Sequence, residues 1–322
     1  MKTIQRTLGI FIILFSMLIS PVQAKENSSS NWMENISGDT KLSSLSIPGT
    51  HDSATQYVSL SPIFQCQDTD IQTQLENGNR YLDIRLALEK DDLILKHNIA
   101  KCRKSKSFFS TPLTLDDVLN DIYTFLDQNP SETVIFCVKK ENKKDDLNKI
   151  KSILNSKINT NSWYTENQIP TLDEVRGKII LATRFKNEYG LYLNWEEQGD
   201  RNILDIPHKK EDMNVSESFF VQDRFNYGVE DKIQAIEYCL ENSMSNDSTF
   251  YLNFASTSGK GKIGFPKKYA NKINKHLKKY DWNKKNYGII IVDFADQELA
   301  HKIYLTNKKS QSILIRFDFL LS

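Results

Sequence analysis

Leu45-Ser46-Ile47-Pro48-Gly49-Thr50-His51-Asp52-Ser53 is the stretch around which the rest of the chain is organised. Its apolar residues Leu45 and Ile47 predict a short buried strand. The regular strand ladder should stop at Pro48-Gly49, because proline cannot donate to it and glycine tolerates a turn, and the segment then continues to His51. Enzymes with parallel sheets carry their chemistry just beyond the carboxyl ends of strands, so His51 is a candidate general base. Taken alone, a histidine that only caps a turn is the alternative interpretation.

The first 24 residues have the features of an export signal. Lys2 and Arg6 give a positively charged start, and an apolar run follows from Leu8 to Ile19. Val22-Gln23-Ala24 then has small residues at the spacing typical of a signal-peptidase cleavage site. The run is too short to span a bilayer comfortably. We therefore expect residues 1–24 to be a signal peptide, residues 25–322 to be one mature domain, and the protein to be secreted.

Acidic and basic residues are nearly balanced. The 322 residues include 42 Lys and Arg against 41 Asp and Glu, and without Lys2 and Arg6 the mature chain keeps 40 basic residues and a formal charge of −1. Such a balance does not indicate a nucleic-acid partner. A mature chain of about 300 residues without a break in composition fits a single large barrel domain.

Four cysteines are spread along the chain, and pairing is possible in an exported protein. Cys66 and Cys102 lie in polar, loop-like sequence, whereas Cys137 falls in an apolar strand and Cys239 on the apolar face of a helix. We expect a Cys66–Cys102 disulfide and two buried free thiols, although spacing alone does not fix connectivity.

Apolar runs alternate with helical patterns along the mature chain. Helices are predicted where a capping signal precedes helical spacing, as at Thr114 and Asp117. Strands are predicted at residues 45–51, 81–86, 93–98, 133–138, 178–183, 219–222, 250–254 and 288–292. Strands that alternate with helices indicate a parallel sheet, and their number indicates a closed barrel. The long polar segment from Trp195 to Ser216 is predicted to be a loop.

Charged or titratable residues gather at the ends of these strands. They are His51-Asp52, Asp83, Arg85, His97, Lys139, Arg184, Asp223 and Asp293. In residues 81–86 the leucines and isoleucine share one face, and Asp83 and Arg85 share the other, which in a barrel can point into the mouth. An exposed edge strand with a surface ion pair is the alternative.

Two histidines combined with cations suit phosphoryl transfer. One imidazole can accept a proton from an attacking hydroxyl while the other donates a proton to the leaving oxygen. A guanidinium stabilises the charge that builds up on the non-bridging oxygens. Each histidine needs a carboxylate to fix its tautomer, and Asp52 and Asp293 are available.

Several of these segments also carry a resemblance to a known family. The segments are Ser46–Asp52, Leu82–Arg85, Leu95–Asn98, Pro130–Thr133 and Val138–Glu141, followed by weaker ones at Arg176–Ile179, Val221–Asp223 and Val292–Phe294. They resemble the X domain of bacterial phosphatidylinositol-specific phospholipase C over nearly the whole mature chain. The resemblance implies an α/β fold, a single distorted TIM-type (β/α)8 barrel, and intramolecular phosphoryl transfer.

The resemblance also implies roles for the two histidines. His51 would be the general base on the inositol 2-hydroxyl, oriented by Asp293. His97 would be the general acid for the diacylglycerol oxygen, partnered by Asp52. The products would be diacylglycerol and inositol 1,2-cyclic phosphate.

Further implied roles concern the phosphate and the sugar. Arg85, positioned by Asp83, would bind the phosphate where metal-dependent relatives hold calcium, so no metal cofactor is expected. The inositol ring would be bound by Lys139, Arg184, Asp223 and Phe225, the last standing where the family has a tyrosine. The expected substrate is membrane phosphatidylinositol or a glycosyl-phosphatidylinositol anchor. A monomer with transient membrane contact is expected, through Phe64 and the loop Lys260–Phe265.

Three other functions stay open at this point. Asp52, Asp83 and Glu141 could hold calcium in a metal-dependent phosphodiesterase, although the Arg85 cation opposes this. A non-catalytic lipid-binding or glycan-binding barrel is possible. Residues 259–264 fit the G-x-G-x-x-G pattern of dinucleotide sites, but Ser256-Thr257-Ser258 separates the strand from the first glycine and two lysines crowd the turn.

Overall fold

The computed structural model describes residues 28–107, 109–199, 208–209, 218–243, 248–260, 263–284 and 286–310. The expected signal peptide, residues 1–24, lies outside the described residues, as does most of the polar segment after Gly199. Within the described ranges, no helix has the length and apolar character needed to cross a membrane.

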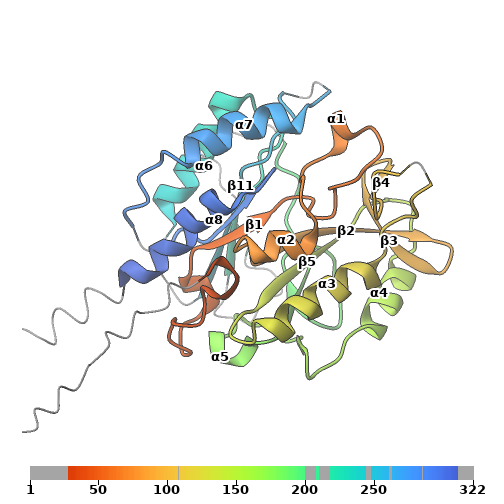
Figure 1. Cartoon of the computed structure of the whole chain (residues 1–322), viewed down its shortest axis with the longest axis horizontal. Coiled ribbons are helices and arrows are strands. Elements are labelled where there is room, and N and C mark those ends of the chain that lie inside the picture. Colours follow the sequence, from red (N-terminus) through yellow and green to blue (C-terminus); the bar gives the residue numbers. More distant parts are fainter. Residues whose placement is uncertain are drawn as a thin grey trace, which may run out of the picture.

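Among the described residues, a curled sheet of twelve strands forms the centre of the fold (Figure 1), and its main path runs β6-β7-β5-β2-β1-β12-β11-β10-β9. The parallel strands on this path are β1 (Ile47–Thr50), β2 (Tyr81–Glu89), β5 (Val134–Lys140), β6 (Trp163–Tyr164), β7 (Ile179–Thr183), β10 (Ser218–Gln222), β11 (Thr249–Phe254) and β12 (Ile289–Val292). A further short strand, β8 (Leu191–Tyr192), pairs with the same edge of β7 as β6 does. The two short strands share one position, so the sheet has the eight positions of a TIM-type barrel.

The barrel has a gap that side chains fill. Strand β9 (His208–Lys209) pairs antiparallel with β10, and no described strand joins β10 to β8 by hydrogen bonds. The Trp195 ring lies across this opening, with its centroid 6.5 Å from that of Phe219 and 5.7 Å from that of Phe254. The predicted TIM-type barrel is therefore confirmed, and its distortion lies between β8 and β10.

Alternate residues of each strand fill the inside of the barrel. In β5, Ile135 and Cys137 belong to the inner cluster, whereas Val134, Phe136 and Val138 belong to the outer one. Successive side chains of a strand point to opposite faces, so a residue two positions beyond an inner one points into the mouth. This alternation places the functional side chains described below.

Helices cover the outside of the sheet, with α3 and α4 on one side and α6, α7 and α8 on another (Figure 1). The helices are α1 (Ser61–Phe64), α2 (Ile71–Glu76), α3 (Leu115–Gln128), α4 (Leu147–Ser156), α5 (Leu172–Val175), α6 (Val229–Asn242), α7 (Pro266–Leu277) and α8 (Gln297–Tyr304), with 3-10 turns at Ser29–Asn31, Leu42–Ser44 and Leu305–Ser310. The predicted capping box starts α3, since the Thr114 hydroxyl accepts from the Asp117 N–H and the Asp117 carboxylate accepts from the Thr114 N–H.

The prediction that residues 93–98 form a barrel strand is wrong. Strand β3 (Asp92–His97) runs antiparallel to β2 and continues into a hairpin with β4 (Ala100–Lys101). Because β2 extends beyond the mouth to Glu89, β3 returns toward the mouth and delivers His97 there. The eighth barrel position belongs instead to β6 and β8, two-residue strands that are too short to produce a sequence pattern.

The prediction that Pro48-Gly49 stops the first strand is wrong as well. Both residues lie inside β1, which pairs in parallel with β12 as far as Thr50.

The expected Cys66–Cys102 disulfide is also wrong, because all four cysteines are free and buried. Cys102 packs in the outer cluster, and its N–H donates to the Leu95 carbonyl. Cys66 lies at the mouth of the barrel, with its Sγ 3.8 Å from Nδ1 of His97. The two thiols therefore belong to different environments, one in the core and one in the pocket.

Candidate active site

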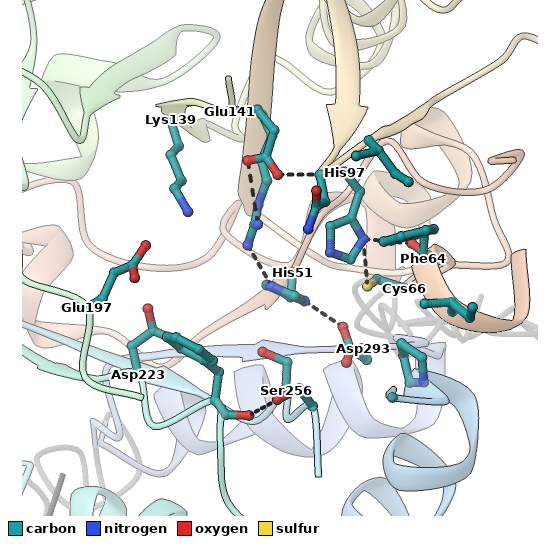
Figure 2. Close-up of a pocket in the computed structure, with 18 of the residues that line it drawn as sticks. His51, Phe64, Cys66, His97, Lys139, Glu141, Glu197, Asp223, Ser256 and Asp293 are labelled. Carbon is teal, nitrogen blue, oxygen red and sulfur yellow. Dashed lines mark hydrogen bonds and ion pairs between the residues drawn. The ribbon is translucent and has the colours of Figure 1, made fainter. Parts of the chain in front are cut away.

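A cavity of about 700 Å³ opens at the carboxyl ends of the strands (Figure 2). Its lining includes eight of the ten predicted site residues: His51, Arg85, His97, Lys139, Arg184, Asp223, Phe225 and Asp293. The other two, Asp52 and Asp83, are 2% and 1% exposed and form ion pairs with the lining residues. The structure thus brings all ten residues to one place.

The two-residue period of the strands explains this convergence. In β12, Ile289 and Ile291 face the inner cluster, and Asp293 continues the same face into the mouth. In β2, the buried Tyr81 is followed on its face by Asp83 and Arg85. Four more side chains follow inner residues of their own strands at an even spacing and therefore also point into the mouth: His51, Lys139, Arg184 and Asp223.

His51 is held from both ring nitrogens. Its Nδ1 lies 2.7 Å from Oδ1 of Asp293, and its Nε2 accepts from Nη2 of Arg85 at 2.8 Å. Burial lowers the pKa of His51, but the Asp293 and Asp52 carboxylates outweigh this and leave the pKa above its ordinary value. The lone pair at Nε2 therefore faces the centre of the pocket on a ring oriented by Asp293, as a general base requires.

His97 approaches from the opposite side. Its Nδ1 donates to the Phe64 carbonyl oxygen at 2.8 Å, which leaves Nε2 free to face the site. Nε2 lies 3.4 Å from Oδ2 of Asp52, and the same oxygen is 3.5 Å from Nε2 of His51. The two ring centroids are 6.4 Å apart, so one carboxylate lies between two imidazoles that could act on the two ends of a small group.

The Arg85 guanidinium is surrounded by carboxylates. Nε lies 2.9 Å from Oδ1 of Asp52, Nη2 lies 3.3 Å from Oδ2 of Asp83, and Nη1 lies 3.7 Å from Oε2 of Glu141. Burial opposes the charge on Arg85, but these carboxylates raise its pKa further above the ordinary value. Burial likewise disfavours the charge on Asp83, but Arg85 and His51 hold the pKa of Asp83 at about 2.

This low pKa gives a stability prediction. A depressed carboxyl pKa stabilises the fold above the ordinary value of 3.8, and the contribution disappears as the pH falls toward 2. We expect Asp83→Asn to flatten the loss of unfolding free energy between pH 4 and pH 2, measured by urea denaturation. Asp127→Asn, at an exposed aspartate on the surface of α3, is the matched control and should keep the wild-type slope. Equal slopes for wild type and Asp83→Asn would contradict the assignment.

The other end of the cavity suits a polyol. Figure 2 shows Lys139, Glu197 and Asp223 on the side of the cavity away from His97. Nε1 of Trp195 donates to Oδ2 of Asp223 at 3.0 Å, and the Arg184 guanidinium lies 3.7 Å above the Trp195 ring centroid. Repulsion by Arg85 and burial lower the pKa of Lys139. Cations and carboxylates side by side provide both donors and acceptors for hydroxyl groups.

Among the lining residues that were not predicted as part of a sugar or phosphate site, three have polar side chains at a regular spacing: Glu141, Glu197 and Ser256. Glu141 Oε1 accepts from the backbone N–H of Asn98, which ties β5 to the loop after His97. Each of the three lies two positions beyond an inner or site residue, namely Lys139, Trp195 and Phe254. The alternation that predicted Arg85 could have found them, had it been continued past the strand ends.

The buried carboxylates that a metal ion could use are paired with the Arg85 guanidinium. Among the described residues, His51, Asp52 and Cys66 each offer one ligand atom within 4.8 Å of the others. Burial, followed by the Asp293 and Asp52 carboxylates, raises the pKa of Cys66 well above its ordinary value, so the thiol keeps its proton. Calcium prefers six or more oxygen ligands, and the Arg85 guanidinium already contacts Asp52 and Asp83.

Comparison with known proteins agrees with this geometry. Residues 43–185 match the family model described as phosphatidylinositol-specific phospholipase C, X domain. This stretch of the chain is similar to the X domain of that family. A Listeria monocytogenes protein named 1-phosphatidylinositol phosphodiesterase is 29% identical over 86% of this chain and 84% of its own. A Staphylococcus aureus protein of the same name is 27% identical over 89% and 92%.

Solved structures extend the family match beyond residue 185. A phosphatidylinositol-specific phospholipase C from Staphylococcus aureus has a TM-score of 0.73 and 25% identity, over 87% of this chain and 98% of its own. The Listeria monocytogenes enzyme has a TM-score of 0.68 and 26% identity, over 87% and 99%. The whole barrel, including the strands that carry Asp223 and Asp293, therefore has the architecture of bacterial phosphatidylinositol-specific phospholipases C.

Proposed function

We propose that this protein is a phosphatidylinositol-specific phospholipase C that releases diacylglycerol and inositol 1,2-cyclic phosphate. The observation that supports it most is the pair of imidazoles flanking one guanidinium. His51 and His97 each have one ring nitrogen bound to a separate partner and the other turned toward the site. The named activity of the family members supports the same substrate.

In the proposed reaction, His51 Nε2 takes the proton of the inositol 2-hydroxyl. The freed oxygen attacks phosphorus, the bond from phosphorus to the glycerol oxygen breaks, and His97 donates a proton from Nε2 to that leaving oxygen. Asp293 and Asp52 orient the two rings. Because the nucleophile belongs to the substrate itself, the first product is a cyclic diester and this step consumes no water. In a slower second step, His97 takes a proton from a water that attacks phosphorus, the bond from phosphorus to the 2-oxygen breaks, and His51 returns its proton to that oxygen, so the same site hydrolyses the cyclic phosphate.

Arg85 stabilises the phosphate as its charge redistributes. Its Nη2 contacts the base nitrogen of His51 when no substrate is present, and substrate binding would turn this N–H toward a non-bridging oxygen. Asp83 and Asp52 hold the guanidinium for this role. With a guanidinium in this position, we propose that the reaction needs no metal ion.

The sugar end would select an unphosphorylated polyol. Lys139, Arg184 and Asp223 are assigned to the inositol hydroxyls, with the Phe225 ring as the surface on which the sugar stacks. Asp223 and Glu197 both place carboxylates there, and a phosphate on the ring would meet like charge.

Membrane contact is proposed at the rim next to the cavity. Ile263 and Phe265 are 72% and 48% exposed, and α1 packs near the start of α7 on this rim. Lys260 and Lys267 add exposed cations. Apolar tips with neighbouring lysines are typical of reversible contact with a lipid surface. One solved structure of the Staphylococcus aureus relative addresses the modulation of its membrane binding.

The double substitution Ile263→Ser with Phe265→Ser tests this surface. Burying a large apolar side chain contributes about 1.5–3 kcal/mol, so partial insertion of two predicts roughly a tenfold or greater loss of vesicle binding. Vesicle sedimentation measures the partition, and hydrolysis of soluble inositol 1,2-cyclic phosphate is the control and should not change. Unchanged sedimentation would move the contact to another part of the rim.

The proposed substrate is tested by offering the purified protein vesicles in which one lipid is varied. Vesicles of phosphatidylcholine are doped with phosphatidylinositol, with phosphatidylinositol 4-phosphate or with no inositol lipid, and released diacylglycerol is measured. We expect release from phosphatidylinositol alone. Release from phosphatidylcholine would contradict the inositol assignment, and binding without release in a folded protein would favour a lipid-binding barrel without catalysis.

A further inference from the structure

A fully buried lysine lies behind the sugar end of the cavity. Lys232 comes from α6, and none of its surface is exposed to solvent. Its Nζ donates to Oε1 of Gln222 at 2.9 Å and to the carbonyl oxygen of Arg224 at 3.2 Å. These acceptors flank Asp223, the carboxylate assigned to the inositol hydroxyls. A buried ammonium bound by neutral oxygens opposes folding, so stability alone does not explain it.

Gln222 connects Lys232 to the neighbouring strand β11 by hydrogen bonds. Its Oε1 also accepts from the Arg224 N–H at 3.0 Å, so one oxygen joins Lys232 to the turn. Its Nε2 donates to Oδ1 of Asn253 at 2.7 Å and to the Phe254 carbonyl at 2.8 Å. The ammonium therefore fixes the end of β10 against β11.

Gln198 holds the same turn from the other side. Its Oε1 accepts from the Asp223 N–H at 2.8 Å, and its Nε2 donates to the Val221 carbonyl at 3.0 Å. Trp195 then fixes the Asp223 side chain through the 3.0 Å bond to Oδ2. The Arg224 guanidinium also donates to Oε1 of Gln198, at 3.1 Å, so Lys232 and Arg224 are the charged groups that support this turn.

Charged and titratable groups from three directions face the Lys232 ammonium. Burial lowers its pKa to about 7 and Arg224 lowers it as well, whereas Asp223, Asp293 and the Cys239 thiol of its own helix act in the opposite direction. Asp223 and Asp293 are the carboxylates that would bind the sugar and orient His51. The positive charge of Lys232 is thus placed behind two working carboxylates.

We propose that Lys232 is a positioning residue for substrate binding, which holds the turn Gln222–Arg224 so that Asp223 meets the inositol ring. This inference rests on the proposed function, because the role of Asp223 does. Hydrogen bonds from a charged donor are roughly twice as strong as those from a neutral one. Loss of the ammonium charge should therefore loosen the turn and weaken sugar binding, while leaving the histidines in place.

Lys232→Met is the direct test, because methionine keeps the apolar stem and removes the ammonium. The substrate is soluble inositol 1,2-cyclic phosphate, and KM and kcat are measured from pH 6 to pH 8. We expect KM to rise about tenfold, equivalent to about 1.4 kcal/mol of binding, with kcat within threefold of wild type. In wild type, KM should rise several-fold as the pH passes 7, and this rise should be absent in Lys232→Met.

Leu240→Met is the matched control on the same helix, since this side chain is buried among Ile273 and Leu277 of α7 and does not act on the Lys232 ammonium. It should leave KM and its pH dependence unchanged. If Lys232 only stabilised the fold, its replacement would change the melting temperature or the active fraction and would leave KM unaltered. An unchanged KM in Lys232→Met therefore overturns the proposal. If that variant does not fold, the wild-type profile decides, and a flat KM between pH 6 and pH 8 overturns it. Failure of the proposed function is distinct, because wild type would then hydrolyse neither the lipid nor the cyclic phosphate.

Discussion

Replacing His51 with alanine should lower kcat on phosphatidylinositol by about 10³-fold or more. General base catalysis by a positioned side chain contributes about 10²–10⁴-fold, and His97 is the only other imidazole among the described residues that lines the cavity. The His51 ring is held by Asp293 and Arg85 and does not belong to the hydrophobic core clusters, so the fold should persist. Turnover is measured with phosphatidylinositol vesicles, and circular dichroism checks the fold.

The substitution Asp293→Asn distinguishes the orientation of the His51 ring by Asp293 from proton transfer by His51 itself. It keeps a side chain of the same shape at 2.7 Å from Nδ1 but removes the charge. We expect a smaller loss of kcat than in His51→Ala, with the acidic limb of the pH profile moved to lower pH, because the Asp293 carboxylate helps to raise the pKa of His51. Turnover of His51→Ala within tenfold of wild type would remove His51 from the role of base.

Replacing Arg85 with lysine should lower kcat by about 10²–10³-fold although the charge is kept. A lysine ammonium cannot reproduce the fork that now contacts Asp52 and Asp83 together, and it cannot present two parallel donors to a phosphate. Steady-state kinetics on the soluble cyclic phosphate measure the effect without interference from the membrane. Arg176→Lys is the matched control, because Arg176 binds backbone carbonyls away from the cavity.

Arg85→Met extends the test from catalysis to stability. It leaves two buried carboxylates without their counter-charge, and breaking such a buried pair costs about 3–5 kcal/mol of unfolding free energy. Urea denaturation at pH 7 measures the loss, which should shrink at low pH as the carboxyls become protonated. If Arg85→Lys retained full activity, the phosphate would have to be bound by another group.

The sequence predicts the site better than it predicts the sheet that carries it. Alternation along residues 81–86 was enough to place Asp83 and Arg85 in the mouth, because a strand buried on both faces has a period of two. The end of an apolar run likewise located Asp223 and Asp293. These are local properties of one strand, and the sequence contains them fully.

The errors concern contacts between distant parts of the chain. His97 was predicted at the mouth, but from a parallel barrel strand, whereas β3 returns antiparallel from an overlong β2. The strands β6 and β8 have two residues each, and only their pairing with β7 defines them. The Cys66 thiol was assigned to a disulfide because its sequence is polar, but its true neighbour is the His97 ring.

The central claim is a metal-independent reaction through a cyclic phosphodiester, carried out by two histidines. Phosphorus NMR of the purified protein with phosphatidylinositol vesicles and excess chelator tests it most directly. We expect the signal of a five-membered cyclic phosphate to appear first, and to be lost in His51→Ala and in His97→Ala. A monoester signal from the start, or turnover only after calcium is added, would contradict the account and would reassign Asp52, Asp83 and Glu141 as metal ligands.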